Sequence, residues 1–258
     1  MWDYMGPVAA MVDDLVTVHR YDQRGSGRSP APPPYDLGDF VADLEVLRRH
    51  WGHERWIVGG HSWGAQLGLL YAGRHPQQVA GLLLISTSGM VEPDVAARRR
   101  AMEQRLGVAG TRRLAELSER LAADPGDGTA DRELTRLAWL AEFARTEAGE
   151  AFADDLLASD FQIDQEVSRA LLAQRGQWLR DAAIRDTILR LDVPALVVFG
   201  TGDLRPSTPA RELAQSLRRA ELLLVPAAGH FPWLERPDVL RPALRQFLAG
   251  VGGRRPLA

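Results

Sequence analysis

The sequence contains no cysteine, no lysine and no asparagine, so all 31 residues counted as lysine or arginine are arginines. Without cysteine the chain can form no disulfide bond and has no thiol nucleophile. Without lysine it has neither a Schiff-base lysine nor the lysine of a phosphate-binding loop. A nucleophile in this chain must therefore come from another residue type.

Charge and hydropathy exclude further classes of protein. The formal net charge is -3, and abundant arginine without lysine is more typical of GC-rich coding than of a nucleic-acid surface. No apolar run approaches the length that spans a membrane, and the first residues lack the basic and apolar regions of a signal peptide. We therefore expect a cytoplasmic protein without a nucleic-acid or membrane partner.

The 258 residues, 45% of them hydrophobic, are enough for a substantial core. Short apolar runs, typical of buried parallel strands, occur at residues 16–22, 56–60, 79–87, 195–200 and 222–226. Helical patterns lie between them, which predicts an α/β fold. Residues 91–190 instead show helical spacing without a convincing strand. We predict a helical insertion there, between two parts of a core formed by residues 1–90 and 191–258.

One corner of the sequence carries chemistry. In "WIVGGHSWGAQLGLLYAGR", residues 56–74, an apolar run ends at two glycines and a helical run follows at once. The pentapeptide Gly60-His61-Ser62-Trp63-Gly64 fits a sharp strand-to-helix turn that presents the Ser62 hydroxyl at the edge of the sheet. There the amide of Trp63 and the start of the helix can stabilise an oxyanion.

A serine hydroxyl needs a base to take its proton, and the base needs an acid to orient it. Among the six histidines, His230 alone lies on a loop of small residues directly after an apolar strand, in "ELLLVPAAGHF". Asp203 follows the buried strand of "ALVVFGTGD", although an aspartate there could equally belong to a turn before Pro206. Ser62, Asp203 and His230 thus occur in the order nucleophile, acid, base, which is the α/β-hydrolase order.

The sequence resembles the α/β-hydrolases, in particular the branch that includes proline iminopeptidases and small bacterial esterases. The resemblance covers nearly the whole chain and is carried by "YDQRGSGRS" (21–29), "GGHSWGA" (59–65), "GTGD" (200–203) and "GHFPWLERP" (229–237). It implies an α/β-hydrolase fold, a mostly parallel sheet flanked by helices, with residues 91–190 forming a helical lid before the acid-bearing strand.

The resemblance also suggests how a substrate is selected. Proline iminopeptidases hold the free amine of the substrate with acidic lid residues, and the residue after their nucleophile looks like Trp63. Glu142 and Glu147 are the candidate acids here, with Trp233 of the shared "HFPWLERP" motif as a further substrate-binding candidate. The alternative is that the lid acids form a solvated helix face.

Together these features predict a serine hydrolase that cleaves a small ester, an amide or a short peptide through an acyl-enzyme, with no cofactor and no metal. A proline iminopeptidase-type aminopeptidase is one alternative. The other is a binding protein on the same fold that is catalytically impaired or inactive.

The N-terminus generates a separate expectation. In the resembling family an HGGPG-like loop ends the third strand, supplies the second oxyanion amide and precedes a segment similar to "WDYMGPVAAMVDD". We therefore expect that N-terminal strands and this loop are absent from the chain through a mis-assigned start codon, which leaves the strand at 56–60 without a neighbour on one side. The alternatives are a genuine deletion, closure of the strand pairing, or a second chain that fills the slot.

Overall fold

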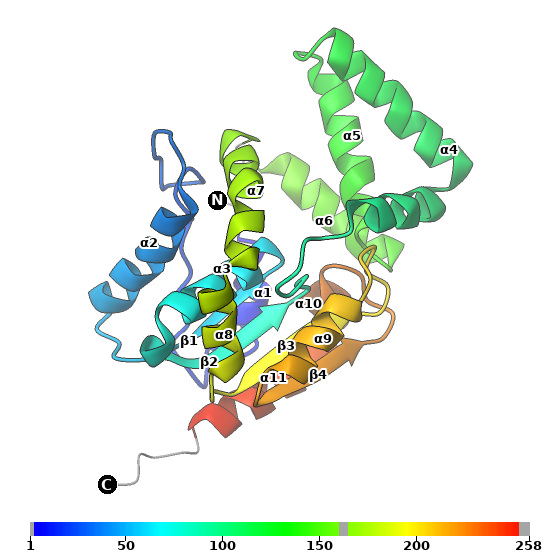
Figure 1. Ribbon diagram of the computed structural model, residues 1–258. Helices are drawn as coiled ribbons and strands as arrows, with labels where there is room; N and C mark the ends of the chain where they lie inside the picture. The colour runs from blue at the N-terminus through cyan, green and yellow to red at the C-terminus, as the bar shows by residue number, and fades with distance from the viewer. Residues whose placement is uncertain (1–2, 160–164, 253–258) are drawn as a thin grey trace, which may run out of the picture.

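The structure is a computed structural model and describes residues 3–159 and 165–252. Four parallel strands form one sheet in the order β1-β2-β3-β4 (Figure 1). The strands are β1 (Trp56–His61), β2 (Val79–Ile85), β3 (Ala195–Gly200) and β4 (Ala220–Val225). They confirm four of the five predicted strands and the predicted α/β class.

The two faces of the sheet pack against different sets of helices, because successive side chains of a strand point to opposite sides. In β3 the side chains of Ala195, Val197 and Phe199 enter one hydrophobic cluster, and those of Leu196 and Val198 enter the other. All six residues of β3 are buried. A continuous apolar run of this kind is what a strand covered on both faces requires.

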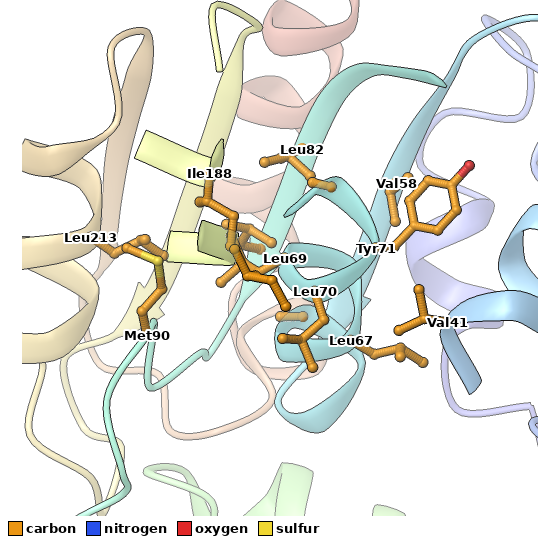
Figure 2. Packing of buried hydrophobic residues seen from close by; sticks show 14 of the residues in the cluster. Val41, Val58, Leu67, Leu69, Leu70, Tyr71, Leu82, Met90, Ile188 and Leu213 are labelled. Atoms are coloured by element: carbon orange, nitrogen blue, oxygen red, sulfur yellow. The ribbon is translucent and has the colours of Figure 1, made fainter. Parts of the chain in front are cut away.

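Figure 2 shows part of the first cluster, to which five helices contribute. These helices are α2 (Leu37–His50), α3 (Trp63–Arg74), α7 (Gln165–Arg180), α8 (Ala182–Arg190) and α9 (Thr208–Ser216). The short helices α1 (Gly6–Ala9) and α10 (Pro232–Glu235) and the last helix, α11 (Pro237–Gly252), contribute to the second cluster. A 3-10 turn, η1 (Pro76–Gln78), leads into β2.

The predicted insertion contains helices only, within the part of it that the structure describes. Figure 1 shows α4 (Val95–Ala123) and α5 (Gly128–Ala141) as a pair that extends away from the sheet, with α6 (Thr146–Ala158) nearer to it. Gly107 interrupts α4 with φ 66° and ψ -175°. Among the described residues, no helix is both long and apolar enough to cross a membrane.

The predicted strand at residues 16–22 is wrong. Within the described residues this segment forms no strand, and the sheet ends at β1. Two of its side chains are partly buried, Val18 against the second cluster and Tyr21 against the first. The apolar run alone could not report whether a neighbouring backbone was present to complete a hydrogen-bonded ladder.

Helices α2 and α3 are joined by a buried carboxylate. Glu45 accepts hydrogen bonds from Arg48 (2.7 and 2.9 Å), from Arg49 (2.6 Å) and from the Tyr71 hydroxyl (3.0 Å). The Arg48 hydrogen bonds, opposed by burial and reinforced by those from Arg49 and Tyr71, lower the pKa of Glu45 from 4.5 to about 2. The ionised form is thus the one that the fold favours.

A depressed pKa makes stability depend on pH. The contribution of Glu45 is fully present above about pH 4.5 and is lost as the pH falls toward about 2. We expect Glu45→Gln to lower the free energy of unfolding at pH 7, and the difference from the parent to shrink across this acidic window. Urea titrations at several pH values measure it. Glu103→Gln, which breaks the exposed pair with Arg99, is the control; a difference for Glu45→Gln that does not change with pH contradicts the prediction.

Candidate active site

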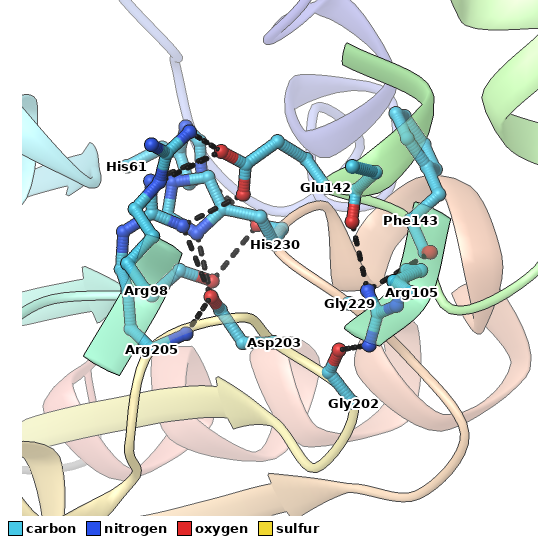
Figure 3. A network of polar contacts seen from close by, with 12 residues as sticks. His61, Arg98, Arg105, Glu142, Phe143, Gly202, Asp203, Arg205, Gly229 and His230 are labelled. Atoms are coloured by element: carbon cyan, nitrogen blue, oxygen red, sulfur yellow. Dashed lines mark hydrogen bonds and ion pairs between the residues drawn. The ribbon is translucent and has the colours of Figure 1, made fainter. Parts of the chain in front are cut away.

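Three predicted site residues lie on loops at one edge of the sheet. Ser62 directly follows β1, Asp203 follows β3 and His230 follows β4. Because parallel strands end at the same edge, these loops are brought together although they are far apart in the sequence. Figure 3 shows the polar contacts around Asp203 and His230.

Ser62 occupies a strained turn between β1 and α3. Its φ is 53° and its ψ is -112°, a region that non-glycine residues rarely adopt. A Cβ atom on Gly60 would lie 2.2 Å from the carbonyl carbon of Gly64, so no side chain fits there. The amide of Ser62 donates to the carbonyl of Ile85 at 2.8 Å, which ties the turn to β2. The turn has the shape predicted for the Gly-x-Ser-x-Gly motif.

Asp203 and His230 form a buried hydrogen-bonded pair. The Nδ1 atom of His230 lies 2.6 Å from Oδ2 of Asp203, and the two side chains are 5% and 0% exposed. Burial opposes ionisation of Asp203, but the nearby His230 and Arg205 outweigh it and hold the pKa of this carboxyl well below its usual range. Since the carboxylate only accepts, Nδ1 carries the proton and Nε2 is left as the basic nitrogen.

The backbone of His230 is held from three sides. Its carbonyl accepts from Nε2 of His61 and from the Ser86 hydroxyl, both at 2.9 Å, and its amide donates to the carbonyl of Glu142 at 2.8 Å. Burial, with His230 nearby, lowers the pKa of His61 well below its ordinary value, so this imidazole is neutral. His61 thereby acts as a fixed donor that orients the loop of His230.

The remaining step, contact between Ser62 and His230, is not made in this structure. Among the described residues no hydrogen bond joins the Ser62 hydroxyl to His230, although the ring of the adjacent His61 lies 4.5 Å from the His230 ring. Catalytic hydrogen bonds are often long before a substrate binds.

The side chain of Trp63, the residue after Ser62, donates from its indole to Oε1 of Gln23 at 3.2 Å. The roles of Ser62 as nucleophile and of the Trp63 amide as oxyanion donor stay predictions.

Of the lid candidates, only Glu142 lies beside the Asp203–His230 pair. It follows α5, its side chain is 5% exposed, and its Oε2 accepts from Nη1 of Arg205 at 2.8 Å. Arg98 of α4 donates to Oε1 from Nε at 3.1 Å and also from Nη2. Burial opposes ionisation of Glu142, but Arg205, His230 and Arg98 together hold its pKa below the ordinary value. The charge of Glu142 is thus already compensated by two guanidinium groups.

Glu147 and Trp233 are placed differently. Glu147 is exposed in the first turn of α6. Trp233 is 1% exposed, donates from its indole to the carbonyl of Tyr4 at 3.1 Å and packs 4.7 Å from the ring of His61. Their contact with a substrate stays a prediction. In this structure Glu147 belongs to a solvated helix face and Trp233 to the hydrophobic core.

Two charged residues near the site were missed at the sequence level. Arg205 donates to Oδ1 of Asp203 from its amide (2.9 Å) and from Nη1 (3.0 Å). Glu235 is 1% exposed and ends α10, shortly after His230 in the sequence. Both residues lie in motifs visible in the sequence, "GTGDLRP" and "HFPWLERP", in which roles were predicted for Asp203, His230 and Trp233 but not for Arg205 or Glu235.

Glu235 joins the loop of His230 to the inserted helices. Its Oε1 accepts from the amide of Gly229 at 2.5 Å, and its Oε2 accepts from the amides of Ala144 and Arg145, both at 2.8 Å. Burial raises the pKa of Glu235 even though these three donors oppose the shift. The buried amide of Gly229 is thereby satisfied, together with two amides of the inserted segment.

The site also contains three groups close enough to share a cation. Ligand atoms of Glu142, Asp203 and His230 all lie within 4.8 Å of one another. However, Glu142 is paired with Arg98 and Arg205, and Asp203 with Arg205 and His230. Two guanidinium groups in direct contact with these carboxylates disfavour binding of a further positive charge. The arrangement suits proton transfer better than metal binding.

The role of Glu235 gives a stability prediction. Glutamine keeps one acceptor oxygen but turns an NH₂ donor toward at least one of the three amides, so Glu235→Gln should cost about 1–3 kcal/mol of unfolding free energy. Urea denaturation at pH 7 measures it. Glu221→Gln, on the exposed side of β4, is the control and should change little. Equal stability of the two variants would show that the clamp is dispensable.

Comparison with known proteins identifies the family and agrees with the fold. A family model described as the alpha/beta hydrolase family matches residues 1–243. A proline iminopeptidase of Xanthomonas citri is 31% identical over 242 residues, which cover 81% of this chain and 73% of that protein. Among solved structures, the enol-lactonase from Burkholderia xenovorans LB400 (24% identity, TM-score 0.69, covering 95% of this chain and 86% of that one) and the proline iminopeptidase of Mycobacterium smegmatis (22%, 0.64, 96% and 85%) share the fold. The chain therefore belongs to the α/β hydrolase family and is a hydrolase.

Proposed function

We propose that this hydrolase works through an acyl-enzyme, with Ser62 as nucleophile, His230 as general base and Asp203 as the acid that orients it. The observation that carries the proposal is the buried 2.6 Å contact between Nδ1 of His230 and Oδ2 of Asp203, on loops at the edge of the sheet where the strained turn places Ser62. The chemistry needs three groups: an ionised acid, a base whose Nε2 can accept a proton, and a hydroxyl at the same edge of the sheet.

In the proposed reaction the Ser62 oxygen attacks the carbonyl carbon of the substrate while Nε2 of His230 takes the hydroxyl proton. The amide of Trp63 and the N-terminal end of α3 stabilise the oxyanion of the tetrahedral intermediate. His230 then gives its proton to the leaving group, and water attacks the acyl-enzyme by the same route. Asp203 stays ionised throughout and stabilises the imidazolium. The reaction needs no cofactor.

For the substrate we propose a small ester, an amide or a short peptide. The similarity to proteins named proline iminopeptidase favours a peptide with a free N-terminus as the second, narrower candidate. Of the two lid acids, Glu142 is the one that lies beside the proposed base, which supports it as the group that would meet such an amine, although Arg98 and Arg205 now neutralise it.

The nucleophile is tested by substitution. Ser62→Ala should lower kcat by roughly 10⁴- to 10⁶-fold, because acyl-enzyme chemistry is lost while the fold is kept. Turnover of a short p-nitrophenyl ester and labelling with a fluorophosphonate probe are the measurements. Ser216→Ala, an exposed serine on α9, is the matched control and should label and react like the parent. Labelling that survives in Ser62→Ala would end the assignment.

The peptidase candidate is tested by a substrate pair. If Glu142 meets the amine, prolyl p-nitroanilide should be cleaved more than about tenfold faster than its N-acetylated counterpart, because a buried carboxylate without its cationic partner is costly. The Glu142→Gln variant should lose this preference. Equal kcat/KM values for the two anilides in the parent protein would instead favour the esterase.

A further inference from the structure

The residue pair Glu142–Arg205 connects the inserted helices to the proposed acid and base. Arg205 contacts Asp203 twice, through its amide at 2.9 Å and through Nη1 at 3.0 Å, and both contacts use Oδ1. His230 uses the other oxygen, Oδ2. The two oxygens of Asp203 therefore have separate partners, so Arg205 fixes the rotation of the carboxylate that His230 meets.

Glu142 contacts Arg205 and His230 from the inserted segment. Its carboxylate pairs with Arg205 through two hydrogen bonds, of 2.8 and 3.3 Å, and its carbonyl accepts the amide of His230 at 2.8 Å. Glu142 lies at the end of α5 in the insertion, whereas Arg205, Asp203 and His230 lie on core loops. Figure 3 shows Glu142 and Arg205 beside Asp203 and His230.

We propose that Arg205 and Glu142 are positioning residues for Asp203 and His230, so that docking of the inserted helices sets the orientation of the base and the charges that surround it. The proposal rests on the proposed function. It goes beyond it because neither residue contacts the reacting atoms and because Glu142 acts here through Arg205 instead of through a substrate.

The charged groups that face His230 make the effect predictable in sign. They are Asp203 and Arg205 on the loop after β3, Glu142 at the end of α5 and Arg98 on α4, with the neutral His61 at the end of β1. An anion beside an imidazole favours its protonated form, and a cation disfavours it. Removing the charge of Glu142 and removing that of Arg205 must therefore have opposite effects on protonation of the base. A general loosening of the structure would not produce two opposite effects.

The test is the pH dependence of kcat/KM for an uncharged p-nitrophenyl ester, with the rate of fluorophosphonate labelling as a second readout of the same base. The base must be neutral to accept a proton, so activity falls on the acid side. Glu142→Gln should move this acid limb to lower pH and Arg205→Gln to higher pH, each by about one pH unit. The double variant should return close to the parent midpoint.

A matched control separates charge from docking. Arg105 of α4 joins the same two parts of the chain, but it donates only to carbonyl oxygens, those of Ala141, Phe143 and Gly202. Arg105→Gln should lower stability or rate, but it should not reproduce the opposite shifts in the pH midpoint of kcat/KM that are expected for Glu142→Gln and Arg205→Gln. In Arg205→Lys, which keeps the charge, the midpoint should stay near that of the parent.

The outcomes distinguish this proposal from the proposed function. If Ser62→Ala keeps full activity, the proposed function fails. If Ser62→Ala is inactive but Glu142→Gln and Arg205→Gln move the acid limb in the same direction, or not at all, the triad stands and the positioning role is overturned.

Discussion

The hydrogen bond from the amide of His230 to the carbonyl of Glu142, 2.8 Å long, is the contact on which the rest of the site depends. It brings two backbones into direct contact, and only glycine allows this, because a Cβ on Gly229 would lie 2.2 Å from that carbonyl oxygen. Once the backbones touch, Glu235 can accept from amides on both sides at once. The loop of the proposed base and the insertion thus form one unit.

This close contact decides the electrostatics. The carboxylates of Glu142 and Asp203 are almost completely buried. Glu142 is paired with Arg98 and Arg205 from other elements, and Asp203 with Arg205 of its own loop and with His230 of the loop after β4. Such groups add little net stability when complete, but removing one partner leaves a buried charge unpaired. The arrangement therefore specifies one geometry of the Asp203–His230 pair more than it stabilises the fold. The proposed acyl-enzyme chemistry would need that specificity, since its base would work in a single orientation.

The sequence was sufficient for features that depend on local patterns. Apolar runs located the four strands, and the positions of Asp203 and His230 after two of them predicted their contact, because parallel strands end at one edge. It failed at residues 16–22, where a ladder depends on a distant backbone. It also could not separate Glu142 from Glu147, two acids in one helical stretch. The first lies past the end of α5 and turns inward, while the second starts α6 and faces solvent.

The placement of Glu142 also limits how a cationic substrate could be recognised. The Nη1 atom of Arg205 donates to both Glu142 and Asp203, so displacing Arg205 from Glu142 would also disturb Asp203. The side chain of Arg205 is only 20% exposed. Arg98 is 35% exposed and comes from α4, and among the hydrogen bonds and ion pairs of the described residues none joins it to Asp203. An ammonium group that binds Glu142 would therefore replace Arg98 and leave Arg205 in place. Selectivity for a free amine would then depend on how much more favourably Glu142 binds the ammonium group than the guanidinium group of Arg98, and not on the presence of the carboxylate alone.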